Sequence, residues 1–506
     1  MCFKLQKKGG DHGSRLTSHP CLPTPVPTEG GQAGITQEGG KRMITFKEGN
    51  LRVPKWNRRV FIVAGGTTAY KKYFPEYKLE ELAMMAFKQM LEDNDLKMDP
   101  LDVKGLINFA TYGEFADHFQ DQLLCEAKIH DYLGLDPLHN LGIKTGGATG
   151  GSTILAAAMA VASGYANVAL AAGWERMDEV DTRTGNYYIA TAACKDFETR
   201  LGRIYSSYYA PMANRFAETF KVSEVTRAKI AVKNHGYACS SPYAHQAGKY
   251  TVEEVLASPI SAYPLRFLEC CAMSAGAACV LVCDEETAYK LTDHPCELFI
   301  CGGTHTLRVA DRRHMEVPLL PNETPETYKD LYSKEGARYP GFESFLAARF
   351  AAWLVYRMAG INNPLEEMDL VELHDAFTIS DLQTYGDIGL RPYGQEQDYI
   401  ESGDAYYTNP NTGKPGKCPS NLSGGLIGTM HAVGATGIFQ AAECLWQLQQ
   451  KYDKFHGDPK TWKKWGKEKP KDWQSLQIPE GSKQALWVSH AGVGSHVTVG
   501  ILRKSW

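Results

Sequence analysis

The sequence predicts an α/β fold made of two similar halves, each a layered, mostly parallel sheet covered by helices. Short, wholly apolar runs alternate with segments of helical spacing, and five elements recur in the same order further along the chain. Wholly apolar strands are typical of sheets that are buried on both faces. The length of 506 residues also exceeds what one small core accommodates, which favours two or more domains.

The first half begins with RVFIVAGGTT, an apolar run that ends in Gly-Gly and predicts a buried strand. The uncharged segment 146–174 is rich in Ala, Gly, Ser and Thr, which favours a buried helix followed by a strand over a membrane span. The predicted strands are 59–68, 103–112, 166–175 and 275–285, and the predicted helices are 79–91 and the segment that ends at residue 163.

The second half repeats this order. ELFICGGTHT resembles RVFIVAGGTT, and HAVGATGIFQAAECLWQL resembles GGATGGSTILAAAMAVAS. From this repeat we predict two halves, at 43–290 and 291–506. In a duplicated fold the binding sites are expected where the two halves meet. The matching elements of the second half are 297–306, 342–361, 368–377, 431–448 and 485–492.

Three segments fall outside the repeat. Residues 176–262 hold many Tyr and polar residues and predict a loop lobe over the site. Residues 392–420 and 452–483 are predicted as loop inserts. The second of them contains WKKWGKEKPKDW, which is typical of an exposed loop; contact with a ligand phosphate or with a partner is the alternative.

Residues 1–42 are rich in Gly, Pro, Thr and Lys without periodicity, and the sequence predicts disorder there. Glu-Gly-Gly lies a few residues before Met43. A purine-rich ribosome-binding site in the gene would encode these residues if it were translated. We interpret 1–42 as a mis-assigned start or an expression leader. A signal peptide is disfavoured because the segment has no apolar core.

The composition disfavours several classes of protein. The net charge of -4 gives no basic footprint for nucleic acid. Thirteen scattered cysteines without a CxxC pair are typical of reduced thiols in a cytoplasmic protein. We predict no metal site and no cofactor.

TGGATGG, 145–151, predicts a loop that turns into the buried start of a helix, where enzymes often place a nucleophile. Here the tip is Gly147. GGATGGSTILAAAM, VELHDAFTISDLQTYGDIGL and NLSGGLIGTMHAVGATGIFQAAE resemble the three signature blocks of the thiolase superfamily. The H-D-A-F sequence is typical of its sterol-carrier-type and archaeal branch. The resemblance spans roughly 59–506 and implies a thiolase-like fold, a coenzyme A thioester as substrate and a homodimer.

The family attaches its acyl group to a cysteine at the helix start, and the resemblance places Gly147 at that position. A backbone N–H does not depend on the side chain, so Gly147 can still donate to an oxyanion at a helix N-terminus. The small residue is also expected to make room for a larger substrate. In the glycine-rich turn SHAGVGSHVTVGIL, the backbone of Gly492 is the matching oxyanion donor.

The resemblance implies roles for three histidines. His374 occupies the position that orients the thioester carbonyl, with Asp375 fixing its imidazole, and Ala376 replaces a possible acid/base cysteine. His431 corresponds to the histidine of G-H-P-x-G-A-T-G, although Met430 and Ala432 depart from that motif. His490 lies near the family's second cysteine and is a candidate acid/base.

The block around FLECCAMSAG lies near the family's pantetheine site. The resemblance therefore assigns Asp375, Cys271, Ser274 and Met430 to substrate or coenzyme A binding. Cys125, Cys270 and Cys271 are the thiols that could replace the missing nucleophile, but nothing near them in the sequence is positively charged and exposed, so we predict buried, inert thiols.

Three functions stay open. The first is an atypical thiolase-type acyltransferase that makes or cleaves a C–C bond in a β-ketoacyl-CoA without the usual cysteine. The second is a retro-aldolase acting on a β-hydroxyacyl-CoA; retention of His374 and His431 disfavours it. The third is a non-catalytic acyl-CoA-binding subunit. The resemblance also implies a small OB-fold partner that carries a zinc ribbon.

Overall fold

The computed structural model describes residues 37–38, 41–42, 52–93, 95–202, 204–307, 318–328 and 341–506. The chain divides into two compact units, Met1–Thr45 and Phe46–Trp506. In the first unit, β1 (Gln37–Glu38) pairs antiparallel with β2 (Lys41–Arg42). The rest of the predicted leader, 1–42, lies outside the described residues.

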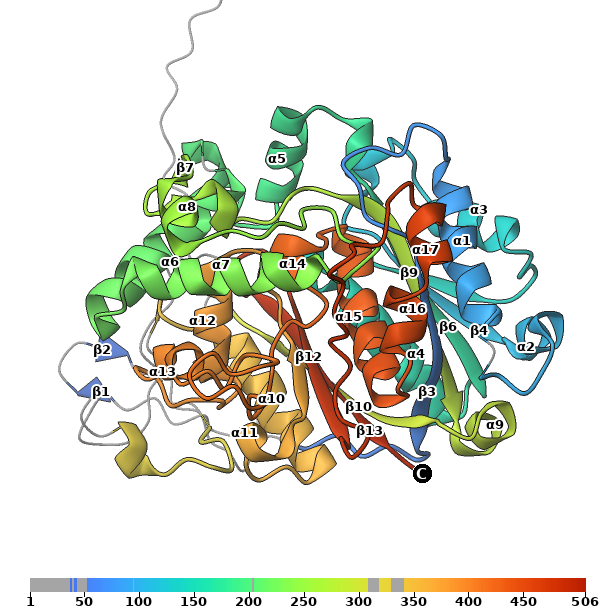
Figure 1. Cartoon of the computed structure of the whole chain (residues 1–506). Helices are drawn as coiled ribbons and strands as arrows, with labels where there is room; N and C mark the ends of the chain where they lie inside the picture. Colours follow the sequence, from blue (N-terminus) through green and yellow to red (C-terminus); the bar gives the residue numbers. More distant parts are fainter. Residues whose placement is uncertain are drawn as a thin grey trace, which may run out of the picture. The chain divides into compact units, whose positions relative to one another are not determined.

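One nine-stranded sheet organises the second unit (Figure 1). Its strands are β3 (Val60–Thr67), β4 (Phe109–Gly113), β5 (Asn140–Ile143), β6 (Val168–Arg176), β9 (Ala275–Asp284), β10 (Cys296–Thr304), β11 (Leu370–Glu372), β12 (Gln484–His490) and β13 (His496–Lys504). They follow the order β11-β12-β13-β10-β3-β9-β6-β4-β5. A separate hairpin pairs β7 (Ile260–Ala262) with β8 (Leu265–Arg266).

The helices of the second unit flank this sheet. They are α1 (Leu79–Leu91), α2 (Pro100–Leu106), α3 (Cys125–Tyr132), α4 (Thr149–Ser163), α5 (Thr182–Ala190), α6 (Tyr205–Phe220), α7 (Glu224–Ala238), α8 (Val252–Ala257), α9 (Glu285–Leu291), α10 (Leu346–Ala359), α11 (Pro364–Glu367), α12 (Thr378–Asp387), α13 (Gln397–Glu401), α14 (Gly425–Gly428), α15 (Val433–Leu448), α16 (Tyr452–His456) and α17 (Pro459–Lys464). Within the described residues, no helix has the length and apolar character that crossing a bilayer requires.

The strand order repeats from the centre outward. From the centre, the first half runs β3-β9-β6-β4 and the second half runs β10-β13-β12-β11. In each half the first strand in the chain lies at the centre of the sheet, and it is followed outward by the last, the third and the second of these four strands. Strands β3 and β10 join the halves through a short antiparallel contact in which Cys296 lies opposite Ile62. The boundary that the sequence predicts, at residue 290, falls near the end of α9.

The strand directions differ from the prediction of a mostly parallel sheet. β4 pairs parallel with β5 and β6, and β11 pairs parallel with β12. The other five pairs of neighbours are antiparallel. A strand buried on both faces is apolar whichever way it runs, so its composition does not reveal its direction.

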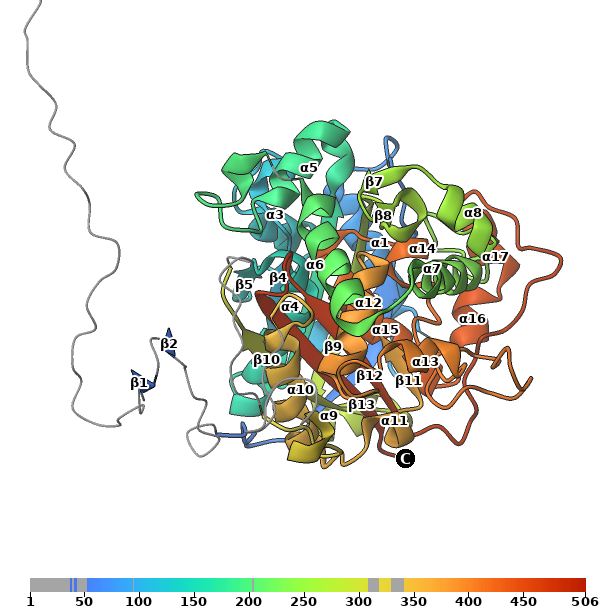
Figure 2. The same ribbon diagram turned by 90° about the vertical axis from the view of Figure 1, so that its left-hand side faces the viewer.

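Helices α4 and α15 form the central layer. Each contacts strands of both halves, α4 through β4 and β13 and α15 through β6 and β12. Both lie in the middle of the views in Figures 1 and 2. A Cβ on Gly150 would come within 2.6 Å of the Gly437 nitrogen, so the two helices cross at a contact that only glycine permits. This crossing brings the N-termini of both helices to the junction of the halves.

Two predicted elements are wrong in detail. Residues 100–106 form α2 instead of the start of a strand, because Asp99 caps the helix by accepting from the Leu101 N–H and Pro100 occupies the first turn. The predicted loop lobe, 176–262, instead contains α5 to α8. Apolar residues recur on one face of α6, from Tyr205 to Phe220, and bury it against the second half.

The two inserts are largely irregular. Residues 392–420 contain only α13, and 452–483 begin with α16 and α17 before continuing as an extended loop. The expectation of an exposed loop is wrong for part of the Lys/Trp-rich run, because Trp462 and Trp465 are buried. An indole ring carries a large apolar surface, and burying that surface stabilises the fold.

Candidate active site

The predicted turn at Gly147 exists, but it has no room for a side chain. Gly147 lies in a single turn, Gly146–Ala148, that leads directly into α4. A Cβ on Gly147 would lie 2.3 Å from the carbonyl oxygen of His490 and 3.2 Å from the Cα of Ala491. The expectation that glycine makes room for a larger substrate is therefore wrong, because protein backbone fills the space.

Three histidine rings meet beside this turn. The ring centroids of His374 and His490 are 4.4 Å apart, and those of His374 and His431 are 5.1 Å apart. His374 follows the end of β11, His490 ends β12, and His431 precedes α15. Because β11 and β12 are parallel neighbours, their carboxyl ends present the first two rings at one edge. The start of α15 supplies the third.

Burial keeps the imidazoles of His374 and His431 neutral. It lowers the pKa of His431 to about 3. It also lowers the pKa of His374 well below the usual value, and the neighbouring His490 and His431 add to this effect. A neutral imidazole carries one donor and one acceptor. These two rings can therefore donate a hydrogen bond to an oxyanion at neutral pH.

His374 has unused hydrogen-bonding capacity. Its side chain is fully buried, and within the described residues neither ring nitrogen has a hydrogen-bond partner. The His431 ring is oriented differently, since its Nδ1 lies 3.1 Å from the Thr436 hydroxyl. A buried polar group without a partner is costly, which makes the His374 ring the natural position for a ligand oxygen.

Asp375 follows His374 in the chain, but its carboxylate bonds to α14 and α7. Its carboxylate accepts from the backbone N–H groups of Leu426, at 2.6 Å, and Ile427, at 3.3 Å, and from the Asn234 side-chain amide at 2.7 Å. Burial raises its pKa to about 6. These bonds tie the end of β11 to α14, the helix that leads to His431, and none of them reaches the His374 imidazole.

A pocket of about 320 Å³ lies beside Ser274, although none of the three histidines of the cluster lines it. Cys271, Met273, Phe267 and His245 are among its lining residues. Ser274 connects this wall to the histidines, because its hydroxyl accepts from the His431 N–H at 3.3 Å and lies 2.9 Å from His245 Nδ1.

The predicted binding residues thus separate into two groups. Cys271 lines the pocket and Ser274 lies directly behind it. Met430 is 1% exposed within the hydrophobic core, and Asp375 is fully buried. His245 is a further residue of this wall; its block, VKNHGYACSSPYAH, also resembles the family, but no role for the histidine is predicted from the sequence.

Aromatic side chains close the cluster on the lobe side. Tyr209 of α6 stacks on Phe377 with ring centroids 4.5 Å apart, and its hydroxyl donates to the carbonyl of Gly492. Phe345 lies 4.7 Å from the His490 ring. Gly492 itself has a φ of +39°, a conformation that favours glycine. The lobe therefore contributes to the wall of the site.

None of the neighbouring thiols is set up as a nucleophile. Burial raises the pKa of Cys125 and Cys270 to about 12 and that of Cys271 well above its usual value. A thiol in that state is almost wholly protonated at neutral pH. In the described part of the chain, no group of three or more His, Cys, Asp or Glu side chains is placed to hold a metal ion.

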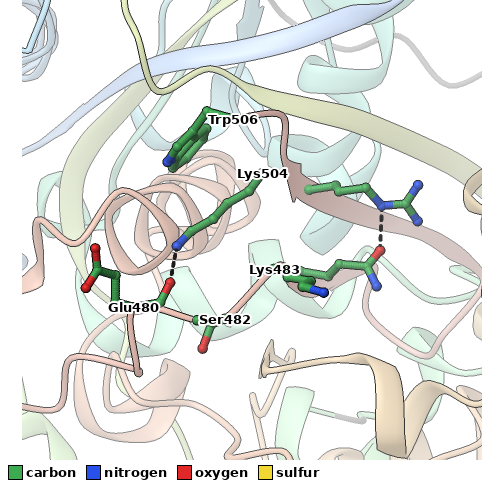
Figure 3. Close-up of a pocket in the computed structure, with 8 residues that line it drawn as sticks. Glu480, Ser482, Lys483, Lys504 and Trp506 are labelled. Carbon is green, nitrogen blue, oxygen red and sulfur yellow. Dashed lines mark hydrogen bonds between the residues drawn. The ribbon is translucent and has the colours of Figure 1, made fainter.

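A second pocket, of about 420 Å³, lies beside the C-terminus and is drawn in Figure 3. Two of its three cationic side chains already donate to the protein. Lys504 Nζ donates to the Glu480 carbonyl at 2.7 Å, and Arg503 Nε donates to Gln484 at 2.7 Å. This pocket shares no lining residue with the pocket beside Cys271. It offers no converging catalytic groups.

Known proteins match this chain along most of its length. Residues 60–286 match the family model of the thiolase N-terminal domain, and residues 336–458 match that of the thiolase C-terminal domain-like family. The acetyl-CoA acetyltransferase of Methanothermobacter thermautotrophicus is 32% identical over 377 residues, which cover 74% of this chain and 88% of that protein.

Two further comparisons agree. Sterol carrier protein 2 of Gallus gallus is 27% identical over 402 residues, which cover 78% of this chain and 66% of that protein. The solved structure of an Ltp2-ChsH2(DUF35) aldolase matches with a TM-score of 0.63 at 18% identity, over 89% of this chain and 98% of that one. The thiolase-like α/β fold and the resemblance on which it was predicted are confirmed.

Proposed function

Because the chain belongs to the thiolase family, we propose that it makes or breaks a carbon–carbon bond beside the carbonyl of an acyl-CoA thioester without forming an acyl-enzyme. One observation carries this proposal: the His490 carbonyl lies where a side chain at Gly147 would begin. The family's covalent step has no atom to perform it at this position. The neutral histidines remain beside it.

The proposed chemistry is that of an enolate. Breaking a bond next to a thioester carbonyl leaves negative charge on the carbonyl oxygen, and preorganised donors lower the barrier to that charge. His374 and His431 are assigned as donors to this oxygen, with the Gly147 and Gly492 amides as further donors. His490 is assigned to move the proton, since a neutral imidazole is the commonest general base.

The first candidate reaction is acyl transfer. The thiol of free coenzyme A would attack the β-carbonyl of a β-ketoacyl-CoA directly, the Cα–Cβ bond would break, and the enolate would take a proton. This reaction needs two coenzyme A molecules at the site together. The pocket beside Cys271 is the proposed route for the thioester.

The second candidate is retro-aldol cleavage of a β-hydroxyacyl-CoA. A base removes the hydroxyl proton, the Cα–Cβ bond breaks, and a carbonyl compound and the enolate separate. The blocked side-chain position at Gly147 favours this reaction, because it needs one thioester and no nucleophile. The solved structure that matches with a TM-score of 0.63 is that of an aldolase, which supports considering it.

The assembly belongs to the same proposal. A homodimer in the cytoplasm, with a small OB-fold zinc-ribbon partner, remains a prediction from the family resemblance. The aldolase of that same solved structure is named for two components, Ltp2 and ChsH2(DUF35), which supports a search for a partner.

Turnover on paired substrates tests the proposal. Purified protein, with any co-purifying partner retained, is given β-ketoacyl-CoA and β-hydroxyacyl-CoA thioesters with and without free coenzyme A. Cleavage of the ketoacyl thioester only with coenzyme A identifies acyl transfer, and release of a carbonyl compound without it identifies aldol cleavage. Binding without turnover would contradict the proposal and leave a thioester-binding subunit.

Measuring the intact mass of the protein tests the absence of an acyl-enzyme separately from the cleavage of the carbon–carbon bond. Protein quenched during turnover should show no acyl adduct at any residue. A stable adduct on a cysteine would overturn the cysteine-free mechanism even if a carbon–carbon bond is cleaved.

A further inference from the structure

A third pocket, of about 490 Å³, lies between α7 and the segment 470–476. One face of α7 forms a wall of it, with residues spaced four apart along the helix. These are Val232, Lys233, Gly236 and Tyr237, and Ser240 lines the pocket just past the end of the helix. The pocket shares no lining residue with the pocket beside Cys271. It is therefore separate from the proposed thioester route.

The walls of this pocket are aromatic and fixed in place. Tyr237, Tyr406 and Trp473 line it. The Trp473 indole N–H donates to the Ser240 carbonyl at 2.9 Å, which bridges the two walls. The Tyr237 hydroxyl accepts from the Tyr407 N–H at 2.8 Å. Flat apolar ligands are held best by such preorganised rings, because little freedom is lost on binding.

The charges around the rings favour an anion. Lys249 at the rim pairs with Asp472, but both side chains are 69% exposed, so water weakens this pair. Lys469 and Lys233 also lie near the rings, but their ammonium groups donate to Gly457 and Ser420, so Lys249 is the cation placed to meet a ligand. Asp472 is the one carboxylate among the described lining residues. A ligand carboxylate could thus replace that of Asp472 on Lys249.

We propose that the pocket between α7 and 470–476 is a second ligand site, which binds a small aromatic carboxylate. The ring lies between Tyr237 and Trp473, and the carboxylate meets Lys249. The volume lies within the range of about 300–1,000 Å³ that small-molecule sites occupy. This proposal is independent of the reaction assigned to the histidines.

Gly236 provides the sharpest test. It lines the pocket, and a Cβ added to it meets no atom within 4 Å. The first side-chain atom at this position therefore has open space, Gly236→Leu extends a side chain into the pocket, and leucine favours the helix more than glycine does. Gly105→Leu is the matched control, since Gly105 is also helical with open space at its Cβ and lies outside the pocket.

Binding of naphthoate to the full chain is measured by calorimetry, with neutral naphthamide and naphthylmethylammonium as comparison ligands. Naphthoate should bind more tightly than either. Gly236→Leu should weaken naphthoate binding at least about tenfold, whereas Gly105→Leu should leave it unchanged. Lys249→Glu should also weaken it. Excess coenzyme A should not compete.

Alkylation of half-buried cysteines locates the ligand. Cys239 lines the pocket, and Cys194 does not. Naphthoate should slow alkylation of Cys239 and leave that of Cys194 unchanged. The proposal is overturned by absent naphthoate binding, by equal binding to Gly236→Leu, by competition from coenzyme A, or by a preference for the amide or the cation.

Discussion

The carbonyl oxygen of His490 lies 2.3 Å from the position that a Cβ atom on Gly147 would occupy. The two residues come from opposite halves of the chain and meet because β12 ends beside the start of α4. The Ser489 hydroxyl donates to the Gly147 carbonyl at 3.4 Å and holds the same contact. The backbone of the second half thus closes over the position where a side chain at residue 147 would lie.

Restoring a cysteine should not restore the family's covalent step. Gly147→Cys would force its Cβ against a backbone carbonyl that cannot rotate away, and overpacking of this kind costs about 1–3 kcal/mol of folding stability. Denaturant unfolding measures that cost, and intact mass after incubation with acetyl-CoA should show no adduct. Gly105→Cys, whose Cβ meets nothing within 4 Å, is the matched control. Acylation of the Gly147→Cys variant would show that the backbone can reopen.

Activity and stability should separate at His374. His374→Phe replaces a buried imidazole that has no hydrogen-bond partner within the described residues, so folding stability should stay equal or rise. Turnover should fall by about 10²–10³, the usual effect of losing an oxyanion donor. Thermal unfolding and steady-state kinetics measure the two quantities.

His130→Phe is the control for that experiment. His130 is also buried, but its Nδ1 lies 2.8 Å from the Tyr112 hydroxyl. The control should lose about 1 kcal/mol of stability and keep full turnover. Destabilisation of both variants with equal loss of turnover would mean that His374 is merely structural.

The stability of the fold should fall in mild acid, in part through His431. Its folded pKa is about 3 against 6.5 when unfolded, so the unfolded chain binds a proton that the folded chain does not. This contribution is intact above about pH 6.5 and is lost as the pH falls toward 3. It amounts to about 2 kcal/mol between roughly pH 7 and pH 5.

Comparison of variants isolates this effect from other buried groups. His431→Gln should show a correspondingly smaller loss of unfolding free energy over that interval than the unmodified protein. Equal losses in both proteins would mean that His431 titrates normally in the folded chain. Chemical denaturation at each pH provides the measurement.

Cys271 should matter through its size and not through its thiol. Burial raises its pKa, and it lines the pocket proposed as the thioester route. Cys271→Ala should therefore keep kcat, whereas Cys271→Phe should raise KM for the thioester by roughly tenfold or more. Loss of kcat in the alanine variant would identify Cys271 as a catalytic thiol.

Strong local patterns were the most predictable part of the fold. LEELAMMAFKQML predicts the helix that α1 forms, and the apolar run before Gly65 predicts β3. Weaker patterns led to wrong predictions where a competing signal lay beside them in the sequence. The apolar VKGLINFATY suggested one long strand, although Asp99 and Pro100 begin a helix just before it. The many Tyr residues around 205 concealed an amphipathic helix.

The site was predictable where a motif survives. The family resemblance marks Gly147, His374, His431 and, less definitely, His490. No role in the site was predicted for His245 or Tyr209, because each reaches the site only through the folding of the lobe. The predicted roles of the site residues, the half boundaries and the absence of a cofactor remain predictions.

The sequence by itself determined the fold family and the residue types at Gly147, His374, His431 and His490, because these are properties of residue type and order. Tertiary structure alone decided that backbone fills the space at Gly147 and that His490 joins His374 at 4.4 Å. It also decided that Asp375 anchors α14 instead of an imidazole. The physical reason is that each of these contacts joins segments far apart in the chain, so its geometry depends on how whole strands and helices pack.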